Sequence, residues 1–592
     1  MNDMHIGAIA LALVSVSLLP FSSYAACKRQ AVDLPVTISG TRPVIAAKIN
    51  GADVRFVVDS GAFFSMITPA AAEEFHLKIG MAPLGLRVSG IGGTTVPSLA
   101  TVKAFTLANV SLTNIEFLVG GSGVGSGSIG LLGQNFLESW DVEYNLAQGM
   151  IRLMKDEDCR KAMLAYWVKP DDPVSIIEIA RTTPMKPHTT GFAYVNGAKI
   201  RVAFDTGAAM SMMSRHAAER AGIKLDAAGV VDAGLVAGIG SGMAKSYIVP
   251  VDSIKFADGE EIKHTRLRVA DLDLEFTDML IGADFFLSHR IFVANSQNKL
   301  YLTYNGGPVF NLAKSTPSAA APLPEAGQNK ASNDPADAAA WARRGTASAG
   351  RQDFDRAIAD LTRACELEPA NPDYFFERGQ IYLQTSELEN ALTDFNRVLE
   401  LKPDHVPALM SRAELRISTK NVAEARADLD AIDKNAAKQA EIRFELAMAL
   451  ERANLMPSAI TQLDLWIPSH QEDSRMPIAL ASRCRARAVL GQDLARALKD
   501  CNHAVSGSFK GSNPRIMDTR GFVRLRLGDY DKAIEDYDAA LKMNPQMPAA
   551  LYGRGIAEVR KKKNAEGDAD MAKAERIAPK IAEEFAALGI TP

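Results

Sequence analysis

Short apolar segments of strand length, broken by turn residues, make up the first half of the chain, whereas the second half follows a helical period. From Ile49 to Ile79 the pattern reads as a tight turn at Asn50-Gly51, an apolar strand, a polar loop and a short helix. Beyond residue 338, small and apolar residues recur at a spacing typical of paired helices. The pattern therefore predicts a β-rich half followed by an all-α half.

The β-rich half contains an internal duplication. An offset of 146 residues aligns 49–79 with 195–225 without a gap. The identical positions include Asn50-Gly51-Ala52 with Asn196-Gly197-Ala198, Asp59 with Asp205, Gly61-Ala62 with Gly207-Ala208, and Ser65-Met66 with Ser211-Met212. A repeat of this density predicts two domains of the same fold.

Both copies continue with a Gly-rich segment between strand-like stretches, which we expect to form a mobile hairpin. Its residues are Gly90, Ile91, Gly92 and Gly93 in the first copy and Gly238, Ile239 and Gly240 in the second. Further along, Leu131-Leu132-Gly133 and Leu280-Ile281-Gly282 each end an apolar strand just before a short helix. The order of the three features is thus the same in both copies.

These motifs resemble the active-site loops and flaps of aspartic peptidases of the retropepsin type. Asp59-Ser60-Gly61-Ala62 and Asp205-Thr206-Gly207-Ala208 each follow an apolar strand. A single Asp-Ser-Gly arises often by chance, but here the Asp loop, the Gly-rich segment and the apolar-apolar-Gly motif occur in order, twice. The resemblance covers about residues 34–154 and 173–304. It implies two small closed β-barrels with an active site on the pseudo-two-fold axis between them.

The resemblance implies that Asp59 and Asp205 form a catalytic dyad. Two close carboxyls share one proton because both cannot ionise cheaply, so one serves as base toward a water and the other as acid toward the leaving amine. The flaps would close over a peptide or protein substrate. The residues expected to support the two loops are Ser60, Gly61, Ala62, Ser65, Thr206, Gly207, Ala208 and Ser211.

Two alternatives stay open. In the first, the barrels form an inactive peptide-binding scaffold. The two halves of the cleft are expected to differ, because the first loop has Phe63-Phe64 where the second has Ala209-Met210. Each barrel can also pair with its counterpart in a second chain. The short connection from Lys155 to Pro173 favours pairing within one chain, since it holds the second barrel at high effective concentration.

The helical half resembles a tetratricopeptide array, whose period is 34 residues. We expect about seven repeats, less regular in the middle, where helix starts near Arg443, Ala481 and Met517 are spaced by 38 and then 36. Such arrays bind peptides or protein segments on their concave face, so a protein partner is expected there. The positions spaced by 34 are Ala357, Ala391, Ala425 and Ala459, Gly345 and Gly379, and Pro369 and Pro403.

Composition narrows the possible partners and cofactors. The 592 residues include 66 Lys and Arg against 70 Asp and Glu, and a net charge of −4 lacks the basic excess that binds phosphate backbones. Nucleic acid is therefore not an expected partner. The nine His are scattered and form no metal-binding motif, so we expect neither a metal nor another cofactor.

The N-terminus predicts export. An uncharged apolar run from Ile6 to Phe21 is followed by small residues up to Ala26, which is typical of a signal peptide; an uncleaved anchor or lipidation of Cys27 is the alternative. The compartment would be the periplasm if the source is Gram-negative. No later run of about 18 uncharged apolar residues occurs, so no membrane span is expected after cleavage. Cys27 and Cys159 flank the first domain and are either joined by a disulfide or unrelated thiols.

The predicted protein is thus multidomain, with two all-β retropepsin-like acid protease barrels followed by an all-α tetratricopeptide solenoid. Its expected function is that of an exported aspartic endopeptidase whose helical repeats recruit a substrate or partner. The predicted segments are a signal peptide at 1–26, the first protease domain at 31–155, the second at 172–306, a Pro/Ala/Ser-rich linker at 312–337 and the helical array at 338–589.

Overall fold

A computed structural model describes two compact units, one made of residues up to Val88, Val96–Val236 and Ala244–Arg397, the other of Ser89–Thr95, Ala237–Met243 and Val398–Pro592. The predicted signal peptide, Cys27 and most of the predicted linker lie outside the described residues. None of the helices described is both long and apolar enough to cross a membrane. The described residues are 28–592 without 84–85, 91–92, 109, 122–126, 158, 160–161, 170–171, 182–187, 238–242, 258, 273, 275–276, 311, 313–334, 438–439, 472, 474 and 508–512.

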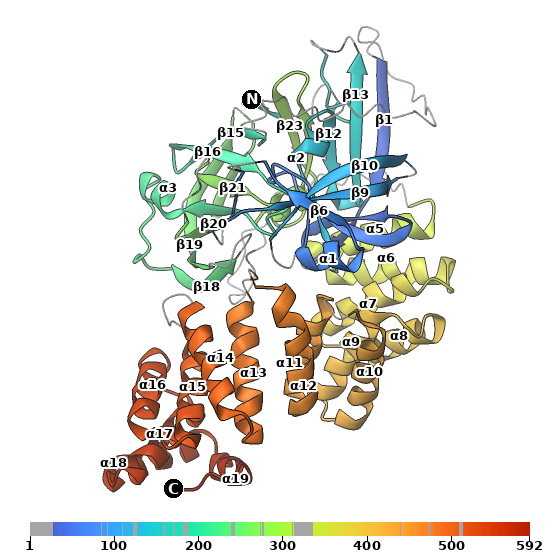
Figure 1. Cartoon of the computed structure of the whole chain (residues 1–592). Coiled ribbons are helices and arrows are strands. Elements are labelled where there is room, and N and C mark those ends of the chain that lie inside the picture. The colour runs from blue at the N-terminus through green and yellow to red at the C-terminus, as the bar shows by residue number, and fades with distance from the viewer. Residues whose placement is uncertain are drawn as a thin grey trace. The chain divides into compact units, whose positions relative to one another are not determined.

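The first barrel is one closed sheet of antiparallel and parallel strands, of which Figure 1 labels β6, β9 and β10. Its strand order is β2-β3-β4-β11-β5-β10-β9-β6, and pairing of β3 with β9 closes it. Its two short helices are α1 (Pro69–Glu74) and α2 (Gln134–Leu137). The strands are β2 (Thr37–Ser39), β3 (Arg42–Ile49), β4 (Ala52–Val58), β5 (Met66–Ile67), β6 (Lys78–Met81), β9 (Ser98–Leu107), β10 (Val110–Val119) and β11 (Gly130–Leu132).

The second barrel repeats this arrangement. Its order is β15-β16-β21-β17-β20-β19-β18, closed by pairing of β15 with β19, so six strands correspond one to one with those of the first barrel. Its helices are α3 (Arg215–Arg220) and α4 (Ala283–Ser288). The strands are β15 (Thr190–Val195), β16 (Ala198–Phe204), β17 (Met212–Ser214), β18 (Val231–Ala237), β19 (Met243–Phe256), β20 (Glu261–Ala270) and β21 (Met279–Ile281). The prediction of two barrels of one fold is confirmed.

Each barrel contains a hairpin whose turn the sequence predicts. Asn50-Gly51 joins β3 to β4, and Asn196-Gly197 joins β15 to β16. All four residues have positive φ, from 48° to 89°. A two-residue turn with both φ angles positive matches the twist of the strands it joins, and Asn followed by Gly is the pair that adopts it most readily.

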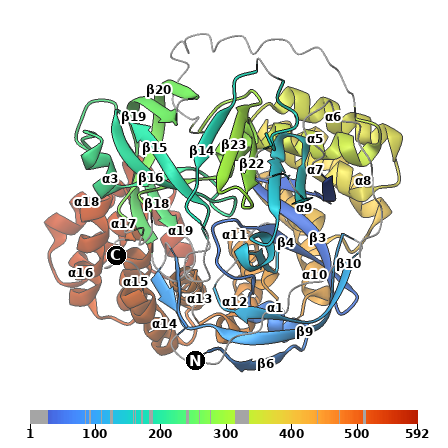
Figure 2. The same cartoon turned by 90° about the horizontal axis from the view of Figure 1, so that it is seen from above.

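A third sheet joins the two copies of the β-rich half. Its order is β1-β13-β12-β22-β23-β14, so three strands come from each copy, and they meet where β12 pairs with β22. Figure 2, seen from above, shows β22, β23 and β14 side by side. One hydrophobic core runs through both barrels and this sheet. The strands are β1 (Lys28–Pro35), β12 (Asp141–Asn145), β13 (Met150–Glu157), β14 (Ser175–Glu178), β22 (His289–Ala294) and β23 (Lys299–Tyr304).

The first helix of the array packs on the barrels. Ala347 of α5 (Ala338–Gly350) is fully buried in the barrel core, and the Thr346 hydroxyl accepts a hydrogen bond from the backbone N–H of Ile38 at 3.4 Å. A Cβ added to Gly350 would lie 3.0 Å from side-chain atoms of Ile38 and Leu287, which belong to different barrels. The sequence places a boundary at the linker, yet the first compact unit continues to Arg397.

We therefore expect Ala347→Asp to destabilise the barrels as well as the array. It would bury an unpaired carboxylate in the shared core, a change that typically costs about 3 kcal/mol or more. Thermal unfolding of the full chain measures the effect, with Ala340→Asp, a half-buried position in the first turn of α5, as the control. Equal melting temperatures for the two variants would contradict the role of α5 in the barrel core.

In the described part of the helical half, the helices form seven hairpins and a final helix, as the 34-residue period predicts. Cys484 and Cys501 form a disulfide between the two helices of one hairpin, and Cys365 is a buried free thiol. After α5, the helices are α6 (Phe354–Leu367), α7 (Pro372–Gln384), α8 (Leu388–Leu401), α9 (Val406–Ser418), α10 (Val422–Asn435), α11 (Ile442–Arg452), α12 (Met456–Trp466), α13 (Met476–Leu490), α14 (Leu494–Gly507), α15 (Pro514–Arg526), α16 (Tyr530–Met543), α17 (Pro548–Arg560), α18 (Asn564–Ile577) and α19 (Ile581–Ala587).

An Arg–Asp ion pair joins the two helices in six of these hairpins. The guanidinium of the first helix makes a bidentate contact with a largely buried carboxylate of the second, at N–O distances of 2.5 to 3.1 Å. Buried polar groups need such partners, so these pairs fix how the helices of a hairpin meet. The pairs are Arg344–Asp360, Arg378–Asp394, Arg412–Asp428, Arg483–Asp500, Arg520–Asp536 and Arg554–Asp570.

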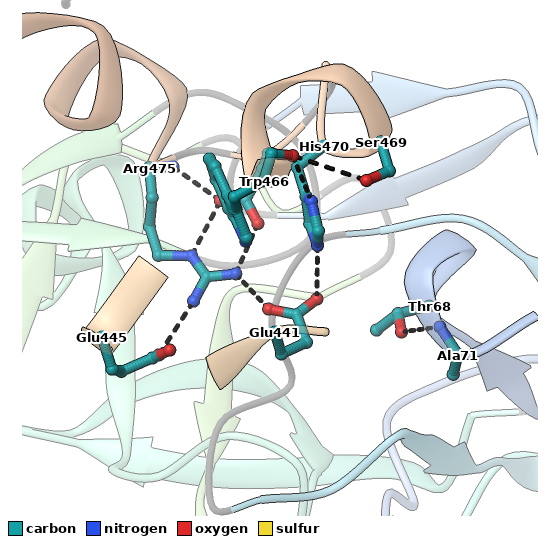
Figure 3. A network of polar contacts seen from close by, with 9 residues as sticks. Thr68, Ala71, Glu441, Glu445, Trp466, Ser469, His470 and Arg475 are labelled. Atoms are coloured by element: carbon teal, nitrogen blue, oxygen red, sulfur yellow. Dashed lines mark hydrogen bonds and ion pairs between the residues drawn. The ribbon is translucent and has the colours of Figure 1, made fainter. Parts of the chain in front are cut away.

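The hairpin of α11 and α12 departs from this rule. Leu446 and Gln462 stand 34 residues after Arg412 and Asp428, and Arg443 donates to Gln462 instead. A different polar network joins this hairpin to the segment before α13 (Figure 3). Arg475 contacts Glu441, Glu445 and Asp473, while His470 stacks on Trp466 at 4.2 Å. This hairpin is where the sequence spacing loosens from 34 to 38 residues.

Candidate active site

Each candidate catalytic Asp stands directly after a buried strand. Asp59 follows β4, and its backbone N–H donates to the carbonyl of Leu132 in the parallel neighbour β11 at 2.9 Å. Asp205 follows β16 and donates in the same way to Ile281 of β21 at 2.9 Å. The two copies thus hold their Asp residues by the same backbone contact.

Backbone amides of the following residues fix each carboxylate. Oδ1 of Asp59 accepts hydrogen bonds from the N–H groups of Gly61 and Ala62, both at 2.9 Å. Oδ1 of Asp205 accepts from Gly207 at 2.8 Å and Ala208 at 3.1 Å. One oxygen of each carboxyl is therefore held by its own loop.

The two Asp loops hold each other within one chain. The backbone N–H of Ser60 donates to the Thr206 hydroxyl at 3.0 Å, and the N–H of Thr206 donates to the Ser60 hydroxyl at 2.9 Å. Each hydroxyl in turn donates across to a carbonyl of the opposite strand, Ser60 to Phe204 at 2.9 Å and Thr206 to Val58 at 2.6 Å. Both side chains are buried, so this reciprocal network is shielded from water.

Glycine is required where the loops approach. A Cβ built on Gly61 would lie 2.2 Å from Cγ of Asp205, and a Cβ on Gly207 would lie 2.2 Å from Cγ of Asp59. Real Cβ atoms essentially never come closer than 3.0 Å to another heavy atom. The two glycines therefore allow each carboxyl to lie close to the opposite loop, in addition to any role in a tight turn.

Ser65 and Ser211 support the loops from the side. The N–H and hydroxyl of Ser65 both donate to Oδ1 of Asn135, at 2.7 and 2.9 Å, and Ser211 makes the same pair of contacts with Asp284, at 2.8 and 2.7 Å. Asn135 and Asp284 are the second residues of α2 and α4. Sequence reasoning missed these two acceptors, although both follow the duplicated apolar-apolar-Gly motif.

The carboxyl of Asp59 has a shifted pKa. Burial raises the pKa of Asp59 well above its usual range, and the negative charge of Asp205 and a hydrogen bond to its carboxyl raise it further. The amides of Gly61 and Ala62 oppose this shift. Such a pair retains one proton at a pH where isolated carboxyls are ionised, so it can take a proton from one atom and give one to another.

Two further residues stand behind the first loop. Tyr144 of β12 is fully buried, lies within hydrogen-bonding reach of the Ser60 side chain, and has its pKa raised by burial. Gln134 of α2 donates to the Ser60 carbonyl at 2.7 Å. Neither was predicted, because a buried Tyr in a strand and a Gln opening a helix look like ordinary core and surface positions.

The predicted flaps are only partly described. Gly90 ends β7 (Val88–Gly90) and Gly93 begins β8 (Gly93–Thr95), which pair as a two-stranded hairpin. Ile91, Gly92, Gly238, Ile239 and Gly240 lie outside the described residues. Ser89–Thr95 and Ala237–Met243 belong to the second compact unit, so their closure over a substrate stays a prediction.

Metal-binding side chains do not converge in the described part of the chain, where no three or more His, Cys, Asp or Glu residues are placed to share an ion. Of the two cysteines that were expected to be either joined or unrelated, Cys159 is buried and disulfide-bonded, and Cys27 lies outside the described residues. The titratable groups that the two loops bring together are the carboxyls of Asp59 and Asp205.

Comparison with known proteins gives two families for the two halves. The family model described as aspartyl protease matches residues 45–136 and 193–285, and the tetratricopeptide repeat model matches 343–406, 376–440 and 520–580. No curated protein matches the chain.

Similar solved structures include a tetratricopeptide repeat protein from Parabacteroides merdae, with 22% identity and a TM-score of 0.28, covering 40% of this chain and 86% of the other. The Cut9-Hcn1 hetero-tetramer of the APC/C shows 14% identity and a TM-score of 0.33, covering 43% and 49%. YrrB, a tetratricopeptide repeat protein with an unusual peptide-binding site, shows 16% identity and a TM-score of 0.23, covering 39% and 98%.

Proposed function

Because the chain carries two aspartyl protease domains followed by tetratricopeptide repeats, we propose that it is a single-chain aspartic endopeptidase. The observation that carries the proposal is the reciprocal bonding of Ser60 and Thr206, at 3.0 and 2.9 Å, between the two Asp loops of one chain. This contact brings the carboxyls of Asp59 and Asp205 together, so one chain supplies both halves of the dyad.

In the proposed reaction, Asp59 and Asp205 hold a water between them and share one proton. The ionised carboxyl takes a proton from the water as it attacks the peptide carbonyl carbon, and the protonated carboxyl polarises the carbonyl oxygen. A proton then passes from the dyad to the leaving amine as the C–N bond breaks. The dyad ends the cycle with one proton, as it began, and the pair titrates as a unit.

Incubation of the full-length protein with a diverse peptide library, from acidic to neutral pH, tests the proposal. We expect shortened peptides with the natural protein and intact peptides with Asp59→Asn, both read by mass spectrometry. The alternative, an inactive scaffold, predicts that the natural protein binds peptides without shortening them. The shifted pKa of Asp59 favours the enzyme, since perturbed carboxyls cluster at catalytic sites.

The helical repeats are proposed to recruit a protein substrate or partner. Arrays of this kind present an extended concave surface to peptides and protein segments. The family match to tetratricopeptide repeats over residues 343–440 and 520–580 supports this role.

Export is also proposed, to the periplasm if the source is Gram-negative. The N-terminal apolar run supports it, and so does the disulfide of Cys484 with Cys501, since such bonds persist in oxidising compartments. We expect N-terminal sequencing of the secreted protein to start after Ala26, and the intact mass to fall short of the reduced mass. A mature protein that begins at Met1 and contains only free thiols would contradict export.

A further inference from the structure

A histidine of the second barrel lies against the first Asp loop. His188 Nε2 is 2.7 Å from the carbonyl oxygen of Gly61, and the centroid of its ring is 4.2 Å from that of Phe63. The side chain is half-buried. A group from the second copy therefore touches, at two points, the loop that carries Asp59.

The next residue ties the same segment to both loops. The carbonyl of the buried Thr189 accepts the backbone N–H of Phe204, the last residue of β16, at 3.0 Å. Its hydroxyl lies 3.5 Å from Nε2 of Gln134, which holds the Ser60 carbonyl at 2.7 Å. His188 thus stands on backbone that is fixed to the second loop while its side chain reaches the first.

The first barrel makes a contact in the opposite direction. The hydroxyl of Thr41, just before β3, donates to the carbonyl of Ala209 in the second loop. The offset of 146 residues aligns His188 with Arg42. An arginine keeps its charge at every physiological pH, whereas a histidine changes charge near neutrality. The second barrel alone therefore brings a titratable group to this position.

The hydrogen bond to the Gly61 carbonyl requires a hydrogen on Nε2 of His188. A nitrogen that bonds to a carbonyl oxygen must carry a hydrogen, so both the neutral Nε2–H tautomer and the imidazolium can make this bond. Burial lowers the pKa of His188, while the Gly61 carbonyl and the charge of Asp205 raise it in part. Asp205 is the charged group that acts on the ring, and Asp59 lies in the loop whose Gly61 carbonyl the ring contacts.

We propose that His188 is a positioning residue of the peptidase, which holds the first Asp loop from the opposite barrel and, in its protonated form, places a positive charge beside the dyad. The inference rests on the proposed function. A nearby positive charge favours the singly ionised dyad over the fully protonated one, so His188 extends cleavage toward lower pH. The hydrogen bond to Gly61 keeps Asp59 oriented in both protonation states.

Kinetics of His188→Ala and His188→Gln test this role. We expect His188→Ala to lower kcat about 10-fold with little change in KM, because one hydrogen bond that orients the loop is lost. Gln should restore much of kcat, since its amide can donate the same bond. Both variants lose the charge, so the acid limb of their pH profile should move to higher pH. His216→Gln, at an exposed position on α3, is the control and should change neither kcat nor the pH profile.

A titration that needs no catalysis separates this inference from the proposed function. The NMR titration of His188, assigned by its loss in His188→Gln, should move to lower pH in the Asp59→Asn/Asp205→Asn double variant, which removes the negative charge of the dyad. An unmoved titration, or His188→Ala with unchanged kcat and pH profile, overturns the inference. If the natural protein cleaves no peptide, the proposed function fails instead, and the titration alone decides whether His188 faces the dyad.

Discussion

Asp59→Asn is expected to abolish peptide cleavage, with a loss in kcat of roughly 1,000-fold or more, and Asp205→Asn is expected to do the same. An amide can neither take a proton from water nor return one to the amine, and the remaining carboxyl cannot perform both steps. The double variant should be no worse than either single variant, because residues that act as a unit are not additive. Steady-state cleavage of one peptide selected from the library measures all three.

Mixing the two single variants tests whether the dyad forms within one chain. If Asp59 of one chain paired with Asp205 of another, a mixture would regain activity through restored dyads. If each Asp paired with its own copy in a second chain, one site would survive each single substitution. The hydrogen bonds between Ser60 and Thr206 join the two Asp loops of one chain, so we expect the dyad to form within one chain and the mixture to stay inactive.

A stability measurement shows whether lost cleavage reflects chemistry or misfolding. Burial and Asp205 raise the pKa of Asp59 above its ordinary 3.8, so the folded state binds this proton more tightly than the unfolded chain. Ionisation therefore lowers stability as the pH rises above that value. Asn carries no charge, so Asp59→Asn should melt at a higher temperature than the natural protein at neutral pH, and this gain should vanish below pH 3.8. A lower melting temperature at neutral pH would indicate misfolding.

Gly61→Ala is expected to reduce kcat about 100-fold or more, although it changes no catalytic group. The new Cβ would stand 2.2 Å from Cγ of Asp205, where at least 3.0 Å is needed, so the carboxyl or the loop must move by close to an ångström. That shift disturbs the bonds of Asp205 to the amides of Gly207 and Ala208. Gly207→Ala should have the same effect through Asp59, and cleavage kinetics measure both.

Gly80→Ala is the matched control for these variants. It lies in β6, where an added Cβ would meet only the carbonyl oxygen of Leu99 at 4.0 Å. We expect it to cleave peptides at the natural rate. Wild-type activity in Gly61→Ala would mean that the two carboxyls do not approach as the loops place them, and it would count against the shared dyad.

The sequence by itself determined the parts of this protein that depend on local structure. Asn50-Gly51 predicted its turn because Asn followed by Gly is the pair that most readily adopts two consecutive positive φ angles. Asp59 and Asp205 were recognisable because each follows a strand in a segment that occurs twice. The helical half was readable from its period, which also carries the Arg–Asp pairs at a spacing of 16 residues, or 17 in Arg483–Asp500.

The missed residues of the site share one physical reason. His188 and Gln134 act through backbone carbonyls of another segment, and any donor of suitable reach can fill such a place. Asn135 and Asp284 sit in a motif that had been noticed as a helix start, yet their partners, Ser65 and Ser211, lie about 70 residues away. No local pattern of polarity marks a side chain for such a contact.

Only the tertiary structure decided how the copies combine. Pairing of β12 with β22 joins strands of the two halves, His188 meets a loop 127 residues earlier in the chain, and α5 meets Ile38 across 308 residues. These contacts depend on how apolar faces of separate elements fit together when the core closes. Periodicity and turn residues determine each element, but they do not show which faces of the elements pack together. The barrels could therefore be predicted from the sequence, whereas the contacts that form the site depend on how the barrels pack.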